Sequence, residues 1–204
     1  MQDIKEAILF SHSCTEALKW MAFLFAGLLE GTWTHCAEEF HITSTPPARK
    51  VVFIRTSDNC RKSTDEFMHV VWRVQLKSGE VWAVDLTGAQ AGIPMSCAPW
   101  HDYSRAYIQD ILSDEYFGFC AIRRWRERLD TTCAVGDAAN DLQQQMLVEL
   151  EHAVEAWGNV HNMDLRKLIK SNDDDFKDQR DIFIRHVCER LERKTNELMG
   201  RESA

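Results

Sequence analysis

The sequence predicts an α+β fold in which a small antiparallel sheet packs on a central buried helix, with a mostly helical C-terminal half. Three observations predict this fold. The apolar run 17–29, broken only by Lys19 and Gly27, suits a core helix. Residues 69–90 read as two strands joined by a glycine turn, and apolar residues recur at helical spacing after residue 104.

The composition limits the classes of protein to which this chain can belong. The 204 residues are 45% hydrophobic, which suits a single globular domain over 1–204. A net charge of −8 argues against general affinity for nucleic acid, and we expect no DNA partner. Seven cysteines without a CxxC pair suit a reducing compartment, and the charged N-terminus does not resemble a secretory signal. The longest apolar run is too short to span a bilayer, so we expect a cytoplasmic protein without membrane contact.

The N-terminal half begins with a predicted short helix over 3–10. Ser13, with Glu16 three residues later, forms a capping-box pattern, so the buried helix should begin at Cys14. A β-branched and aromatic run over 50–55 predicts a buried strand. Polar stretches on either side predict loops at 41–49 and 56–66.

Apolar residues at helical spacing predict several helices in the C-terminal half. Gly158 is a predicted helix stop, and the acidic segment near 171–178 is the best position for a hinge. The predicted helices cover 104–112, 115–129, 139–157 and 179–199.

The hairpin within 69–90 has a register that the residues themselves predict. A three-residue loop ending at Gly79 places Leu76 opposite Glu80 and separates two distinct faces, whereas a two-residue loop mixes polar and apolar residues on both. One face then carries Val70, Trp72, Val74, Leu76, Trp82, Val84 and Leu86, and the other carries His69, Val71, Arg73, Gln75, Val81, Ala83 and Asp85.

In this register, Asp85 lies opposite Val71 and diagonal to His69. The backbones of diagonal residues are roughly 7–8 Å apart, which leaves the Asp85 and His69 side chains within reach of a hydrogen bond. We expect the pair on the face away from the core. A histidine oriented by a carboxylate serves as a general base or a metal ligand, although such residues at strand ends are also common on ordinary surfaces.

Cys14 is the candidate nucleophile. The free N–H groups and the dipole at a helix N-terminus stabilise a thiolate, and the same groups can bind an oxyanion. The alternative is that Cys14 is a small core residue. The other cysteines lack this position, and a metal site is disfavoured because its candidate ligands match no zinc spacing. Those candidates are His35, Cys36, His41 and Cys60.

The order of these features resembles the transglutaminase-like branch of the papain-like thiol enzymes. The resemblance rests on Cys14 and its helix, then PPARKVVFIR at 46–55, HVVW at 69–72 and WAVDLTG at 82–88. Trp72 falls one position later than the family pattern. The resemblance covers a catalytic core over 11–90 and leaves a helical extension over 104–204 unexplained.

This resemblance implies a Cys-His-Asp triad. Cys14 resembles the nucleophile, His69 the base and Asp85 the orienting carboxylate. The family's chemistry runs through a thioester and includes peptide hydrolysis, transamidation, deamidation and acyl transfer. No cofactor is implied. An adaptor that retains an inactive fold is a third alternative, which the complete triad argues against.

A narrower resemblance is to the arginine-containing cyclodipeptide synthases of fungal biosynthetic pathways, on VDLTGAQ at 84–90 and the helical tail. It implies aminoacyl-tRNA and other small amino-acid-derived substrates. The stretch RRWRER at 123–128 bears on this, because clustered arginines with an aromatic residue hold phosphates and stack bases. A solvated helix face is the ordinary interpretation of the same residues. The candidate tRNA contacts are Arg123, Arg124, Arg126 and Arg128.

Overall fold

A computed structural model describes residues 14–29, 33–45, 52–55, 60–63, 68–120 and 134–200. The predicted helix over 3–10, the Ser13 cap and most of the predicted helix over 115–129 lie outside the described residues. The chain divides into two compact units. One comprises 1–22 and 31–126, and the other comprises 23–30 and 127–204. The first unit is called the sheet unit below, and the second the helical unit.

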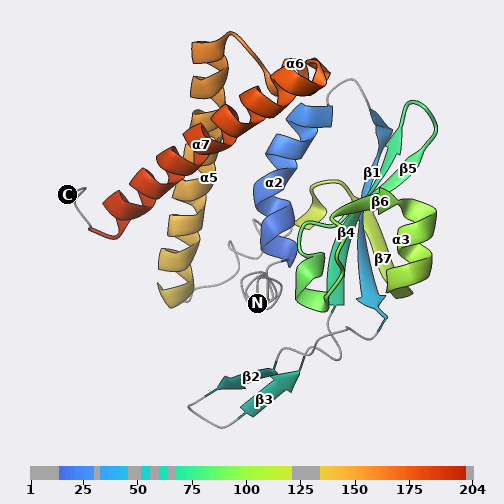
Figure 1. The fold of residues 1–204 in the computed structure, drawn as a ribbon. Coiled ribbons are helices and arrows are strands. Elements are labelled where there is room, and N and C mark those ends of the chain that lie inside the picture. Colours follow the sequence, from blue (N-terminus) through green and yellow to red (C-terminus); the bar gives the residue numbers. More distant parts are fainter. Residues whose placement is uncertain are drawn as a thin grey trace. The chain divides into compact units, whose positions relative to one another are not determined.

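The sheet unit is built on a five-stranded antiparallel sheet with the strand order β6-β5-β4-β1-β7 (Figure 1). Strand β1 pairs with β4 on one side and with β7 on the other, so it is interior to the sheet. The fold is α+β, as predicted. The strands are β1 (Trp33–Ser44), β4 (Met68–Leu76), β5 (Val81–Val84), β6 (Cys97–Pro99) and β7 (Ile108–Tyr116).

Strand β1 is a correction to the sequence analysis, which predicts no strand there and a loop from His41. Its polar residues interrupt the apolar alternation that predicts a strand. Glu39 is fully buried, and its carboxylate accepts the backbone N–H groups of Gly118 at 2.7 Å and Cys120 at 2.8 Å. Because tertiary hydrogen bonds satisfy this buried charge, the strand does not need the apolar alternation by which strands are recognised.

A second correction concerns residues 108–116. Helix α3 (Trp100–Tyr107) ends before this segment, which forms strand β7 and so contradicts the predicted helices over 104–112 and, at its start, 115–129. Ile108, Ile111 and Leu112 have helical spacing in the sequence, but the last two are about half exposed. The apparent amphipathic stripe is therefore a set of edge-strand side chains rather than one face of a helix.

The predicted strand over 50–55 is confirmed as β2 (Val52–Arg55). It pairs with β3 (Cys60–Ser63) in a separate two-stranded sheet, so the predicted loop over 56–66 is wrong at β3. The two strands are close in sequence, since Arg55 pairs with Cys60, but the residues of β3, CRKS, lack the apolar alternation that predicts a strand.

The predicted register of the β4–β5 hairpin is confirmed. Val74 pairs with Trp82 and Gln75 with Val81, which brings Leu76 opposite Glu80. The Leu76 N–H donates to the Glu80 carbonyl oxygen at 2.8 Å. Gly79 closes the loop with φ at +92°, a conformation that favours glycine.

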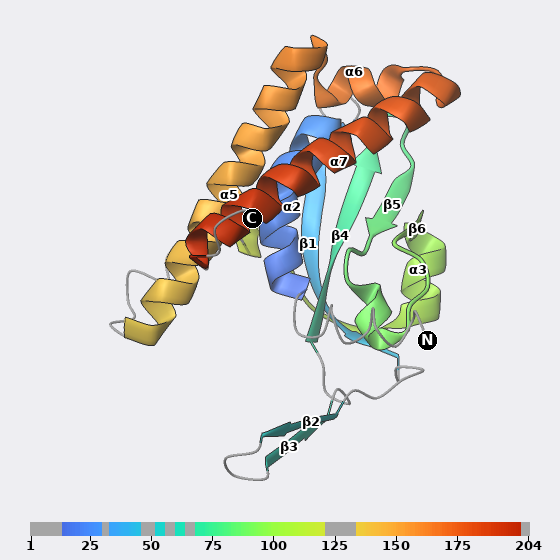
Figure 2. The ribbon, with the colours of Figure 1, turned by 60° about the vertical axis from the view of Figure 1, so that its left-hand side comes forward.

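Both faces of this hairpin are covered, which corrects the expectation that His69 and Asp85 face away from the core. Trp72 is fully buried on one face, although its neighbour Trp82 is only half-buried. On the other face, α3 lies beside β5 and β6 (Figure 2). A core cluster there comprises Ile42, Val71, Ala83, Ile93, Ala98 and Tyr103.

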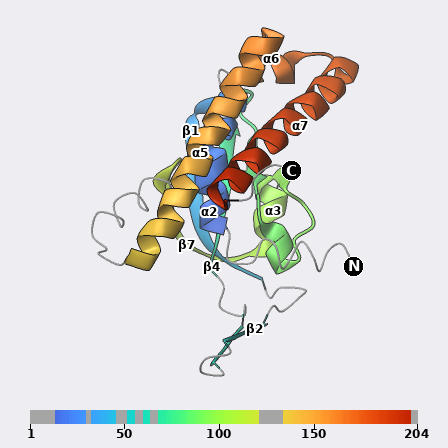
Figure 3. The same cartoon turned by 90° about the vertical axis from the view of Figure 1, so that its left-hand side faces the viewer.

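Helix α2 (Cys14–Leu29) begins at the predicted residue. In the helical unit, α5 (Ala134–His161) contains the predicted helix over 139–157, and α7 (Asp173–Leu198) covers the predicted helix over 179–199 up to its last residue. The two helices pack against each other (Figure 3). The short helix α6 (Leu165–Lys170) is not predicted. The core of the unit comprises Leu24, Leu150, Ala153, Trp157, Leu165, Leu168 and Val187.

Two predicted breaks in the helical unit are wrong. Helix α5 continues through Gly158, where a Cβ would lie 2.8 Å from the Met163 carbonyl oxygen, so the glycine permits a close approach rather than ending the helix. The acidic segment near 171–178 is the start of α7. Asn172 caps this helix by accepting the Asp175 N–H at 3.0 Å, and aspartates in a first turn complement the helix dipole.

Candidate active site

His69 and Asp85 form a buried pair. His69 is the second residue of β4, and Asp85 directly follows β5. The His69 Nε2 lies 2.9 Å from Asp85 Oδ1, and the two residues are 0% and 2% exposed. The diagonal placement expected from the register therefore brings the two side chains into hydrogen-bonding contact.

Two further groups donate hydrogen bonds to the Asp85 carboxylate. The backbone N–H of Thr87 donates to Oδ1 at 3.1 Å, and the hydroxyl of Tyr103 on α3 donates to Oδ2 at 2.6 Å. A Cβ at Gly88 would clash with Oδ2, so only glycine leaves room for the carboxylate. The carboxylate is thus held by several donors within a buried environment, where hydrogen bonds to a charge are strong.

Cys14 is the first residue of α2 and is 5% exposed. Its sulfur lies 3.9 Å from Thr15 Oγ1 and 4.0 Å from the carbonyl oxygen of Met68, the residue before His69. The thiol is near enough to the His69 side chain for each group to shift the pKa of the other. The structure therefore brings together the three residues predicted as a triad, in the order Cys14, His69, Asp85.

The electrostatics of the site favour charge separation. Burial acts to raise the pKa of the Cys14 thiol, but hydrogen bonding to His69, the His69 charge and Thr15 outweigh it and lower the pKa below 9.0. Burial likewise acts to lower the pKa of His69, but hydrogen bonds to Asp85 and Cys14 raise it to about 9. These opposite shifts favour a thiolate beside an imidazolium, the reactive form of a thiol nucleophile.

Tyr103 remains a hydrogen-bond donor at all ordinary pH values. Burial, followed by the Asp85 charge, raises the pKa of its hydroxyl far above the usual range. Sequence reasoning did not single out Tyr103, because no local pattern connects a residue on α3 to a carboxylate on the hairpin. It also did not assign a role to Gln90, whose amide lies 3.0 Å from His69 Nδ1.

Most of the remaining predicted residues lie outside the described part of the chain. The candidate tRNA contacts Arg123, Arg124, Arg126 and Arg128 lie outside the described residues. Of the alternative metal ligands, the side chains of His35, Cys36 and Cys60 also lie outside them. His41 is buried, and its Nε2 lies 3.9 Å from the sulfur of Cys120.

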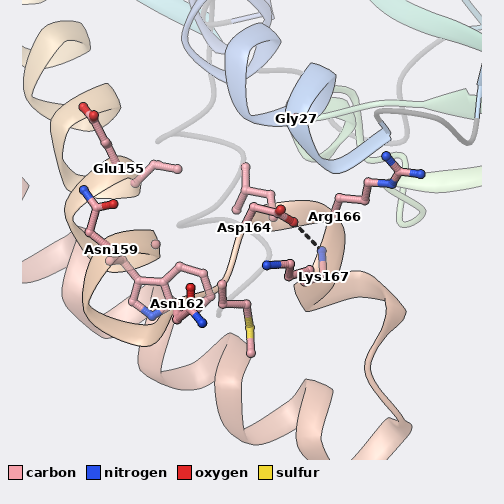
Figure 4. Close-up of a pocket in the computed structure, with 12 residues that line it drawn as sticks. Gly27, Glu155, Asn159, Asn162, Asp164, Arg166 and Lys167 are labelled. Carbon is pink, nitrogen blue, oxygen red and sulfur yellow. Dashed lines mark hydrogen bonds between the residues drawn. The ribbon is translucent and has the colours of Figure 1, made fainter.

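A separate pocket of about 420 Å³ lies in the helical unit, between the end of α5, α6 and Gly27 (Figure 4). Asn159, Asn162 and Lys167 are among its lining residues. The lining contains no cysteine, histidine or hydroxyl side chain, and its ionisable groups are those of Glu155, Asp164, Arg166 and Lys167. The residues of the predicted triad are not among those that line this pocket and belong to the sheet unit.

Within the described helices, none combines the length and apolar character needed to cross a bilayer. Comparison of the chain with protein-family models, curated proteins and solved structures finds no match. The case for function therefore rests on the geometry and chemistry of the triad itself.

Proposed function

We propose that the protein is a thiol acyltransferase that acts through a thioester on Cys14, with His69 as the base and Asp85 as its orienting carboxylate. The observation that carries the proposal is the juxtaposition of the three side chains. His69 is hydrogen-bonded to Asp85 at 2.9 Å, and the Cys14 sulfur lies 4.0 Å from the carbonyl oxygen of Met68, the residue directly before His69. A nucleophile beside a base, and a base bonded to an orienting group, is the arrangement that covalent acyl transfer requires.

The first half-reaction would transfer the acyl group to the enzyme. The Cys14 thiolate attacks the carbonyl carbon of an acyl donor, and the electron pair of the carbonyl moves to its oxygen. When the tetrahedral intermediate collapses, the bond to the leaving group breaks and the His69 imidazolium gives that group a proton. The backbone N–H groups at the start of α2 are suited to hold the oxyanion.

The second half-reaction would release the acyl group. Neutral His69 takes a proton from the incoming amine or water, which attacks the thioester carbonyl and expels the Cys14 thiolate. Burial of the triad supports this chemistry, since a site from which water is excluded strengthens electrostatic interactions and limits hydrolysis. An acceptor amine would yield an amide, and water would yield a carboxylic acid.

The more specific proposal is an aminoacyl-tRNA-dependent cyclodipeptide synthase of the arginine-containing type, in the cytoplasm. It is supported by the resemblance at VDLTGAQ and by the arginine-rich stretch 123–128. The aminoacyl ester of one tRNA would acylate Cys14, and the amine of a second aminoacyl group would attack the thioester. The resulting dipeptide would then cyclise by attack of its free amine.

A panel of acyl donors tests both levels of the proposal. The purified protein is incubated with charged tRNA, a glutamine-containing peptide or a simple peptide ester, and its intact mass is measured. A thioester adds the acyl mass to Cys14 and is removed by hydroxylamine. An adduct with any donor supports the acyltransferase, and an adduct with charged tRNA together with cyclic dipeptide in the medium of an expressing bacterium supports the synthase.

Cys120→Ala is the matched control for Cys14→Ala. Both cysteines are buried beside a histidine, and the histidine beside Cys14 is the one that Asp85 holds. The adduct should disappear with Cys14→Ala and persist with Cys120→Ala. An adduct that survives Cys14→Ala would overturn the proposal. Reaction with the peptide donors alone would favour a protease, transglutaminase or deamidase on the same triad.

A further inference from the structure

The His69 ring is contacted at both nitrogens by side chains from one short segment. Nε2 lies 2.9 Å from Asp85 Oδ1, and Nδ1 lies 3.0 Å from the amide nitrogen of Gln90. Gln90 is 3% exposed and belongs to the 3₁₀ helix η2 (Gly88–Ala91). A segment of six residues, 85–90, thus holds the imidazole from both ends.

The turn that carries Gln90 is itself well fixed. The Gln90 backbone N–H donates to the Thr87 carbonyl oxygen at 3.0 Å, and its side-chain amide donates to Thr87 Oγ1 at 3.4 Å. The Thr87 N–H in turn donates to Asp85. Because these bonds restrict the backbone and the amide together, the Gln90 amide nitrogen is held toward Nδ1 rather than free to turn.

The partners of the two ring nitrogens indicate which protonation state the site accommodates. A carboxylate accepts hydrogen bonds only, so Nε2 carries a hydrogen. An amide N–H donates, so Nδ1 presents its lone pair to Gln90. If Nδ1 took the thiol proton, its N–H would face the Gln90 N–H. The contact with Gln90 therefore favours neutral His69 over the imidazolium.

The other groups that address His69 act in the opposite direction. Asp85, following β5, and Cys14, on α2, both favour the charged ring, and Tyr103 on α3 reaches it through Asp85. Segment η2 contributes only the uncharged amide of Gln90. Among the described residues that contact the ring, Gln90 therefore favours the neutral form of His69, whereas the two acidic groups favour its charged form.

We propose that Gln90 is a positioning residue that stabilises the neutral form of His69 and so keeps the base ready between the two half-reactions. This role rests on the proposed acyltransferase function. After acylation the thiolate is consumed, and His69 must be neutral to take a proton from the incoming amine or water. A hydrogen bond that is made only to the neutral ring favours that step.

Nuclear magnetic resonance of protein labelled with ¹⁵N at histidine tests the proposal without any substrate. The shifts of the ring nitrogens report the protonation of His69 as pH is varied. Gln90→Met retains the approximate size of the side chain and removes the donor, so the His69 midpoint should rise by about one pH unit. Gln109→Met, at an exposed site on β7, is the control and should leave the midpoint unchanged.

Gln90→Glu provides a second, nearly isosteric variant. A carboxylate beside Nδ1 should hold the imidazolium and raise the midpoint further than Gln90→Met does. A midpoint that falls in Gln90→Met would overturn the proposal, because it would mean that Gln90 presents its oxygen to the imidazolium. Unchanged midpoints in both variants would overturn it as well, since they would mean that the contact does not bear on protonation.

A kinetic measurement then separates this proposal from the proposed function. If the chain forms the Cys14 thioester, Gln90→Met should slow its release about tenfold and slow its formation much less, so that the adduct accumulates. If no donor acylates Cys14, the acyltransferase fails while the magnetic resonance result on Gln90 stands. If the thioester forms and Gln90→Met releases it at the wild-type rate, the role of Gln90 fails alone.

Discussion

Tyr103→Phe removes a single hydroxyl from the site and leaves the ring in place. That hydroxyl donates to Asp85 Oδ2 at 2.6 Å, and both residues are almost completely buried. A hydrogen bond to a buried charge contributes on the order of 2 kcal/mol, because its loss leaves the carboxylate with an unsatisfied oxygen. For a chain of this size, this lowers the melting temperature of the sheet unit by about 4–8 °C.

The same substitution should also reduce the reactivity of Cys14. A carboxylate that has lost a donor is free to shift away from His69, and the base is then held less accurately. A loss of about 1.4 kcal/mol in the activation barrier corresponds to about a tenfold slower reaction of the thiol. The rate of Cys14 alkylation by iodoacetamide at pH 7, followed by peptide mapping, measures this effect.

Tyr107→Phe is the matched control on the same helix. The two tyrosine rings lie 5.3 Å apart, but within the described part of the chain the Tyr107 hydroxyl has no hydrogen-bond partner. Its removal should therefore change the melting temperature by less than about 2 °C and leave thiol reactivity intact. Equal effects of the two substitutions would refute the reasoning, because they would show that the Asp85 contact contributes nothing specific.

Two further predictions concern the space around the carboxylate and the charge of the base. Gly88→Ala would bring a Cβ into collision with Asp85 Oδ2, so alkylation of the Cys14 thiol should slow more than in Tyr103→Phe. The control is Gly79→Ala, which is strained by a φ of +92° and should cost about 1 kcal/mol of stability at an unchanged alkylation rate. Equal alkylation rates in the two glycine variants would contradict this prediction. Against opposing burial, Asp85 and Cys14 raise the pKa of His69 to about 9 from 6.5, so its contribution to stability is present below pH 6.5 and lost as pH rises through 9. The difference in the free energy of unfolding between wild type and His69→Gln, from urea titrations, should shrink across that window, and a constant difference would show that His69 is not charged in the folded state.

The hairpin could be predicted from the sequence because its information is local. Alternation over 69–86 sorts into two faces in only one register, and Gly79 supplies the left-handed residue that this loop needs. The start of α2 at Cys14 could be predicted for the same reason, since an N-cap pattern is a feature of neighbouring residues. These two elements were sufficient to place His69 beside Asp85 and to select Cys14.

The rest of the sheet could not be predicted, because tertiary contacts override the local pattern. Glu39 lies in the middle of β1 as a buried charge that is satisfied by backbone N–H groups from 79 and 81 residues away in sequence. Ile111 and Leu112 sit on an edge strand although their spacing is helical. The roles of Tyr103 and Gln90 could not be predicted for a related reason. A hydroxyl or an amide becomes part of a site only when the fold brings it beside ionisable groups, here Asp85 and His69.

The most direct test of the account is the pH dependence of Cys14 alkylation, measured for each cysteine in the same sample by peptide mapping. Cys97 and Cys188 are exposed and serve as internal references. The account predicts that Cys14 reacts with a midpoint below those of both references, and that His69→Ala moves the Cys14 midpoint upward while leaving the references unchanged. A Cys14 midpoint at or above the references in the wild type, or one that His69→Ala does not move, would contradict the claim that His69 activates this thiol.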